Sequence, residues 1–101
     1  MSDEKITFKF PQHGARLSVG TTPIQLTEEY ELLERGLVIK ADPDNTAKVY
    51  VGREGLNAGE TDELSGYALD AGDTVTIEIE DASKIYVVAA SGTQKVYWLG
   101  I

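Results

Sequence analysis

Residues that could carry acid–base or nucleophilic chemistry are scarce in this sequence. His13 is the only histidine, and the chain contains no cysteine. A histidine that acts as a general base needs a nucleophile and an orienting acid within hydrogen-bond reach. The sequence has no Gly-x-Ser-x-Gly elbow and no Walker or dinucleotide-binding loop. Because His13 lies between Pro11 and Gly14, it is predicted to be an exposed loop residue, and no catalytic residue is predicted.

Carboxylates are the second kind of group that could do chemistry. A glycosidase needs a pair of them across a saccharide cleft, and this acidic sequence offers many pairs, although 101 residues leave little room for such a cleft. Asp42, Asp44 and Asn45 resemble half of a calcium loop, but the bidentate Glu that ends such a loop is missing. Asp and Asn also stabilise turns by bonding the backbone two residues on. We therefore predict a structural turn at residues 42–46, with no metal and no cofactor.

The charge of the chain limits its partners. Seventeen acidic and nine basic residues give a formal net charge of −8. The basic residues are dispersed along the sequence, and a negative surface repels a phosphate backbone. Nucleic acid is therefore not an expected partner. No apolar run is long enough for a signal peptide or a membrane span, so we expect a protein made in a cytoplasm and not bound to a membrane.

Period-two patterns dominate the chain and predict strands. The clearest is Thr74–Glu80, in which Val75, Ile77 and Ile79 point to one face. Two apolar runs follow, at residues 84–90 and 94–101, and the three strands are expected to form a meander. Residues 36–41 and 47–52 bracket the turn at 42–46, which predicts a hairpin with a five-residue loop. Shorter strands are expected at residues 6–10, 15–18 and 22–26.

The sequence as a whole predicts a single all-β domain over residues 1–101. About eight short antiparallel strands favour a small β-sandwich or a jelly-roll-like barrel. Residues 1–5 are expected to be a flexible arm, and the polar residues 53–66 an exposed loop. Residues 27–36 carry helix-capping signals but span only about two turns, so a short helix and an irregular strand both stay open.

The last two strands are apolar on both faces. In residues 94–101, one face carries Lys95, Tyr97, Leu99 and Ile101 while the other carries Val96 and Trp98. A strand of this kind is either covered on both sides or meets another subunit. A homo-oligomer is therefore expected, with a trimer ahead of other states. The candidate interface residues are Tyr86, Val88, Tyr97, Trp98, Leu99 and Ile101.

Several segments resemble a group of small structural proteins of tailed bacteriophages. They are Lys40–Thr46 followed by Val49–Gly52, then Gly66-Tyr67, Leu69, Ala71–Asp73 and Val75, and last Asp81, Ser83–Val87, Gln94–Val96 and Leu99-Gly100. The resemblance covers roughly residues 20–101 and includes head-decoration and tail-associated proteins. Similar proteins carry Thr- and Pro-rich sequence in place of residues 27–35, which favours an extended path there. This chain departs from the pattern at that segment and in its longer acidic loop at 53–65.

The resemblance implies a virion component without catalytic residues. We expect a capsid decoration or cement protein that binds the outer capsid surface or another virion protein. The alternatives are a tail-associated module, a receptor- or carbohydrate-binding accessory module and, less well supported by the residues, a small enzyme. Because one β-sandwich architecture hosts many functions, the fold does not choose among them.

Overall fold

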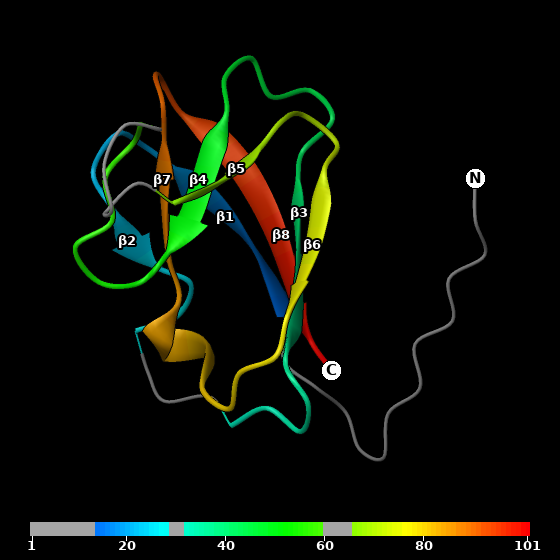
Figure 1. The fold of residues 1–101 in the computed structure, drawn as a ribbon. Coiled ribbons are helices and arrows are strands. Elements are labelled where there is room, and N and C mark those ends of the chain that lie inside the picture. The colour runs from blue at the N-terminus through cyan, green and yellow to red at the C-terminus, as the bar shows by residue number, and fades with distance from the viewer. Residues whose placement is uncertain (1–13, 29–31, 60–65) are drawn as a thin grey trace.

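The computed structural model describes residues 14–28, 32–59 and 66–101 and has an all-β architecture, as the sequence predicts (Figure 1). Within these described ranges, eight strands form two antiparallel sheets of four strands each, which face one another as a β-sandwich. Sheet A has the order β1-β8-β3-β6, and sheet B has the order β2-β7-β4-β5. The strands are β1 (Gly14–Val19), β2 (Ile24–Gln25), β3 (Leu37–Ala41), β4 (Val49–Gly52), β5 (Tyr67–Leu69), β6 (Thr74–Ile77), β7 (Tyr86–Ala89) and β8 (Gln94–Gly100).

The predicted hairpin of residues 36–41 and 47–52 is wrong, because the two strands belong to different sheets. β3 pairs with β8 on one side and β6 on the other, whereas β4 pairs with β7 and β5. Both hydrogen-bonding edges of β3 are therefore occupied, and none is left for β4. The loop between them carries the chain from sheet A to sheet B.

The predicted C-terminal meander is also wrong. β6 lies in sheet A, β7 in sheet B, and β8 returns to sheet A between β1 and β3. A 3₁₀ turn at Ala82–Lys84 makes the first crossing, and it is capped by Asp81, whose Oδ1 accepts a hydrogen bond from the Ser83 backbone at 2.9 Å. Each of the three strands lies near its predicted position, but the predicted pairing of each strand with the next does not occur.

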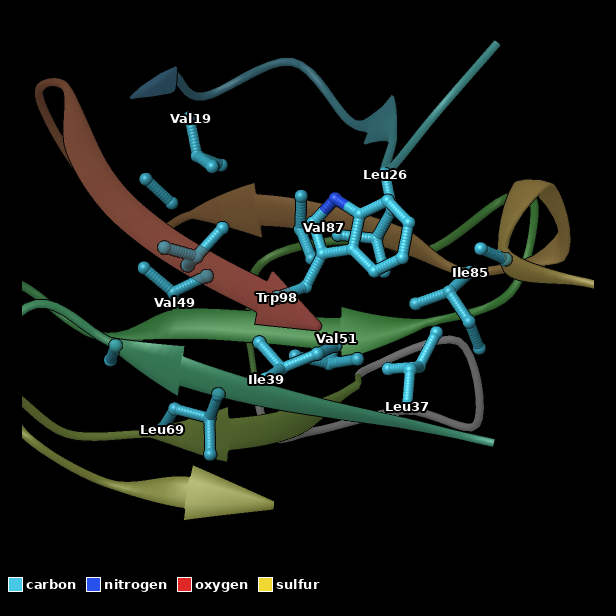
Figure 2. Close-up of a cluster of buried hydrophobic side chains, with 14 of the residues drawn as sticks. Val19, Leu26, Leu37, Ile39, Val49, Val51, Leu69, Ile85, Val87 and Trp98 are labelled. Carbon is cyan, nitrogen blue, oxygen red and sulfur yellow. The ribbon is translucent and has the colours of Figure 1, made fainter. Parts of the chain in front are cut away.

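The main core fills the space between the sheets. Trp98, only 3% exposed, belongs to this cluster together with Leu26, Ile39 and Val87. Figure 2 shows its ring reaching from β8 into the layer between the two sheets. Val75, Ile77 and Ile79 pack against the same cluster, as the alternation predicts. Val75 and Ile77 are only partly buried because β6 is an edge strand, and Ile79, which follows β6, is partly buried as well.

A second, smaller cluster covers the outer side of sheet B. It consists of Tyr50, Val88 and Leu56, with Tyr86 and Ala68 packed against it. Leu56 comes from the segment after β4, which was predicted to be an exposed loop, and is buried here. A Cβ at Gly66 would overlap the Leu56 side chain and approach the Val51 carbonyl oxygen to 2.6 Å, so glycine permits this close packing. The chain itself therefore covers both faces of β7, which accounts for the apolar residues on both sides of this strand.

The segment at residues 27–36 is not helical in the part that the structure describes. Leu32 forms an isolated bridge with Asp81, and the buried Leu33 donates its N–H to the Glu80 carbonyl at 2.7 Å. These bonds hold Leu32 and Leu33 beside Glu80 and Asp81 in the manner of an irregular strand. His13, the predicted strand at 6–10 and the arm at 1–5 lie outside the described residues. The only helix described is the three-residue 3₁₀ turn, and no described helix is long and apolar enough to cross a membrane.

Candidate binding surface

The side chains of sheet A that point away from the core form one continuous surface, called here the sheet A outer face. Strand alternation places every second residue on this face, and the strand register aligns these residues in rows. Its members are Arg16, Ser18, Val38, Lys40, Thr74, Thr76, Lys95, Tyr97 and Leu99.

The middle row of the face is centred on Tyr97. Arg16 and Lys40 lie directly opposite Tyr97 on the two neighbouring strands, and Thr74 continues the row beyond Lys40. The Arg16 guanidinium carbon lies 6.0 Å from the centroid of the Tyr97 ring. That distance allows a cation–π attraction at the limit of its usual range. The row therefore presents one aromatic ring between two cations.

Asp42 fixes the Tyr97 side chain from the end of β3. The Tyr97 hydroxyl donates a hydrogen bond of 2.8 Å to Asp42 Oδ2, and the Asp44 backbone N–H donates one of 2.8 Å to Asp42 Oδ1. Asp42 is 9% exposed. These two hydrogen bonds, the Asp44 bond first, lower the pKa of the Asp42 carboxyl from its ordinary value, and Lys95 and Arg16 add to the effect while burial opposes it.

The next row of the face is uncharged. Leu99 lies opposite Gly14 on one side and Val38 on the other, and Val38 lies opposite Thr76. Leu99 and Val38 are both partly exposed, so their apolar atoms reach solvent. The outer face thus joins an apolar row to a cationic, aromatic row.

The fold gathers basic residues that are far apart in the sequence. Arg16, Lys40 and Lys95 are three of the nine basic residues. Asp42, the residue after β3, bonds Tyr97 at the edge of this face, and its carboxylate offsets part of the charge of Arg16 and Lys95. The basic residues are dispersed along the sequence, and the pairing of β1, β8 and β3 brings these three onto one face. Strand alternation alone could assign Lys95 and Tyr97 to one side. It could not show which strands would stand beside them.

A polar latch holds the cross-sheet loop against β8 at one end of this face. Asn45 Nδ2 donates to the Lys95 carbonyl at 2.9 Å, and the Lys95 N–H donates back to Asn45 Oδ1 at 2.9 Å. Gln94 Oε1 accepts from the Thr46 N–H at 2.9 Å, and Gln94 Nε2 donates to the Ser91 carbonyl at 2.9 Å. The turn predicted at residues 42–46 is present. Within the described ranges, no group of three or more His, Cys, Asp or Glu side chains is placed to hold a metal ion.

The six predicted interface residues do not share one surface. Trp98 and Val88 are 3% and 1% exposed and belong to the chain's own two apolar clusters, so the part of the prediction that placed them at a subunit contact is corrected. Tyr86 is partly buried against the smaller cluster on sheet B. Tyr97 and Leu99 lie on the sheet A outer face, and Ile101 follows at the end of β8, where its N–H donates to the Gly36 carbonyl at 2.8 Å.

A groove of about 790 Å³ opens on the side of the sandwich. It lies where β2, β4, β7 and the 3₁₀ turn meet, and Tyr86, Gln25, Arg53, Lys84 and Asp81 are among its lining residues. Gln25 is held there by a 2.9 Å hydrogen bond from its Nε2 to the Ser83 carbonyl. The groove carries both signs of charge and one aromatic ring, and it is separate from the sheet A outer face.

In comparisons with known proteins, no family model matches this chain, and no curated protein or solved structure matches it. The architecture is therefore assigned from the strand pairing of the chain itself.

Proposed function

We propose that this protein is a non-enzymatic structural component of a tailed-phage virion, which binds the outer surface of the capsid as a decoration or cement protein. The observation that carries the proposal is the sheet A outer face, a broad surface on which Tyr97, Arg16 and Leu99 stand on paired strands. Tyr and Arg are enriched at the centres of protein interfaces. A wide, regular sheet surface suits docking to another protein.

The residues that resemble phage virion proteins support this proposal because several of them build the latch. Lys40–Thr46 and Gln94–Val96 are separated by about half of the chain, yet Asn45, Thr46, Gln94 and Lys95 bond one another directly. The latch fixes the end of β3 against β8 beside Lys40 and Tyr97. Several of the residues that carry the resemblance therefore hold the central row of the candidate surface in place.

The overall charge supports an outer position on the particle. A net charge of −8 disfavours the interior of a filled capsid, where packaged DNA concentrates phosphate. On the outside, an acidic protein keeps the particle soluble while a limited basic face makes the contact. Added interface area would then strengthen the shell, since a stable contact buries roughly 1,200–2,000 Å² in total.

The location of the protein in intact particles tests the proposal. Particles of the phage that encodes the chain would be purified and analysed by quantitative mass spectrometry, and antibody–gold labelling would locate the chain. We expect many copies per particle and labelling over the head. Absence from washed particles would overturn the proposal, and labelling confined to the tail would replace it with the tail-associated alternative.

The groove favours carbohydrate binding as a second candidate function. Tyr86 offers an aromatic ring for a sugar face, and Gln25, Arg53 and Asp81 offer polar partners on its walls. A glycan array followed by NMR titration would test this reading. Binding that is lost in Tyr86→Ala but kept in Tyr97→Ala would support it, whereas no hit on the array would remove it.

A further inference from the structure

We infer that the sheet A outer face binds an acidic protein surface, in which carboxylates flank an apolar patch. This inference rests on the proposed function and names the chemistry of the partner. The face carries Arg16, Lys40 and Lys95, whose charge the Asp42 carboxylate at its edge offsets only in part, on a chain whose net charge is −8. The contrast between this face and the rest of the molecule indicates a complementary negative partner.

The spacing of the cations suits a pair of carboxylates. Arg16 and Lys40 stand on either side of Tyr97, each one strand away from it. Neighbouring strands are about 4.8 Å apart, so the backbones of the two cationic residues are about 10 Å apart. Two carboxylates at a similar separation could each meet one cation, with Arg16 able to bind its carboxylate in a bidentate manner.

The uncharged row identifies the partner as protein. Leu99 and Val38 are partly exposed beside the cationic row and need an apolar surface to cover them. The backbone of duplex DNA offers phosphates but no apolar patch to match this row. A protein surface offers both carboxylates and apolar side chains, and therefore complements both rows.

A second copy of the same face is not the partner. Two copies meeting face to face through a twofold axis would bring Arg16, Lys40 and Lys95 of one copy against the same three cations of the other. Like charges placed opposite one another oppose such a contact. The face is complementary to a different, negative surface.

The central row is held ready for a partner before binding. Tyr97 is fixed by its hydrogen bond to Asp42, and the Asp42 carboxylate is itself bound by the Asp44 backbone and nearly covered. These hydrogen bonds hold the carboxylate at the edge of the face, where its charge also attracts Arg16 and Lys95. A partner meets a ring whose orientation is already set, which reduces the entropy lost on binding.

An NMR titration with octaglutamate as the probe tests the inference on the full chain. We expect amide shifts centred on β1, β3 and β8, and an apparent dissociation constant at least tenfold weaker in R16E/K40E. The matched control is R53E/K84E, which makes the same change in net charge at exposed residues of the groove. It should weaken binding less than threefold. R16Q/K40Q repeats the test with uncharged side chains, should the double reversal not fold.

Four outcomes would overturn the inference. The first is the absence of shifts when octaglutamate is added to wild-type protein. The second is equal weakening of binding in R16E/K40E and R53E/K84E, which would reduce the effect to net charge. A 12-base-pair DNA duplex that binds the same strands more tightly than octaglutamate would change the class of partner. Sedimentation that shows a dimer abolished by R16E/K40E would identify a second copy as the occupant.

Lysine labelling on purified particles separates this inference from the proposed function. An amine-reactive reagent should modify Lys40 and Lys95 at least fivefold less on the particle than in free protein, while Lys84, which is exposed away from the face, stays reactive. If all three lysines are fully labelled on particles, the virion role stands, but another surface makes the contact. If the chain binds octaglutamate but is absent from particles, the inference of an acidic partner stands and the proposed virion role is wrong.

Discussion

At the scale of single residues, Tyr97 and Asp42 connect the stability of the domain to its candidate surface. Tyr97 lies between two cations on the outer face, and its hydroxyl bonds the carboxylate at the end of β3. Asn45 closes the same corner by bonding both polar backbone groups of Lys95, as a neighbouring strand would. Because these groups are local to one corner, their contributions can be measured one at a time.

The first prediction concerns pH and the Tyr97→Phe variant. The Asp42 pKa is lowered in the folded state, so the folded protein prefers the charged carboxylate, and the resulting stability is present above the ordinary value of 3.8. It is lost as the pH falls through the lowered, folded-state value. Tyr97→Phe removes one cause of the lowering, and we expect a lower melting temperature than wild type at pH 7.

Thermal unfolding from pH 7 to pH 2 measures this effect. The gap between wild type and Tyr97→Phe should shrink as the pH falls below about 3.8, where Asp42 begins to protonate in the unfolded chain. Tyr67→Phe is the control, since Tyr67 is 63% exposed. A gap that stays constant down to pH 2 would show that the Tyr97 hydroxyl does not act through the Asp42 charge.

The second prediction concerns the latch. Asn45→Ala removes two hydrogen bonds to the Lys95 backbone, each 2.9 Å long. At about 0.5–1.5 kcal/mol for each bond, the free energy of unfolding should fall by about 1–3 kcal/mol. Urea unfolding measures the change, with the exposed Thr93→Ala in the adjoining turn as control. Equal stability of the two variants would mean that water replaces the latch without loss.

At the scale of elements, the crossings between sheets distinguish this fold from a chain of hairpins. β3 has partners on both edges, so the chain must leave sheet A after Ala41, and the 3₁₀ turn makes the corresponding move after β6. Gly36 allows the start of β3 to approach β6, because an added Cβ there would overlap the Ile77 carbonyl oxygen. A central strand and an edge strand consequently bury their apolar residues to different extents.

The third prediction compares Ile39→Ala with Ile77→Ala. Ile39 is fully buried on the central strand β3, and its truncation should cost about 2–5 kcal/mol of unfolding free energy. Ile77 packs against the core but is only partly buried on the edge strand β6, so its truncation should cost about 1–2 kcal/mol. Chemical unfolding of both variants measures the difference. A larger loss for Ile77→Ala would contradict the strand order of sheet A.

At the scale of the whole molecule, the two outer faces of the sandwich are unlike. Sheet B is covered from outside by Leu56, packed on Tyr50 and Val88, whereas sheet A leaves Tyr97 and Leu99 partly exposed among cations. The apolar residues of β7 therefore have a partner within the chain. Those on the outside of β8 remain available for another protein.

The fourth prediction concerns the oligomeric state. The expected homo-oligomer, with a trimer favoured, stays a prediction. Because like charges on the sheet A outer face repel one another, we expect the contact between subunits to lie on another part of the surface. Light scattering coupled to size exclusion should give a mass above the 11.0 kDa of one chain. R16E/K40E should leave that mass unchanged. If the measured mass equals that of one chain across a concentration series, the predicted oligomer is wrong.

The sequence by itself determined the strands and the direction of their side chains. Alternation is local, so it was enough to predict the all-β class, to direct Val75, Ile77 and Ile79 to the core, and to separate Tyr97 from Trp98 on opposite faces of β8. The Asp- and Asn-rich turn at 42–46 was predictable for the same reason. Its hydrogen bonds from the Asp44 and Asn45 backbone N–H groups to Asp42 join residues that are two and three positions apart.

The tertiary structure alone decided which strands stand side by side. A strand's ladder partner is chosen by the burial of whole faces, which depends on residues far away in the chain, so a hairpin and a meander were expected where the chain crosses between sheets. The same long-range pairing put Trp98 inside the sandwich and covered Val88 with Leu56. It also brought Arg16, Lys40 and Lys95 around Tyr97, because β8 lies between β1 and β3, and neither composition nor spacing encodes that adjacency.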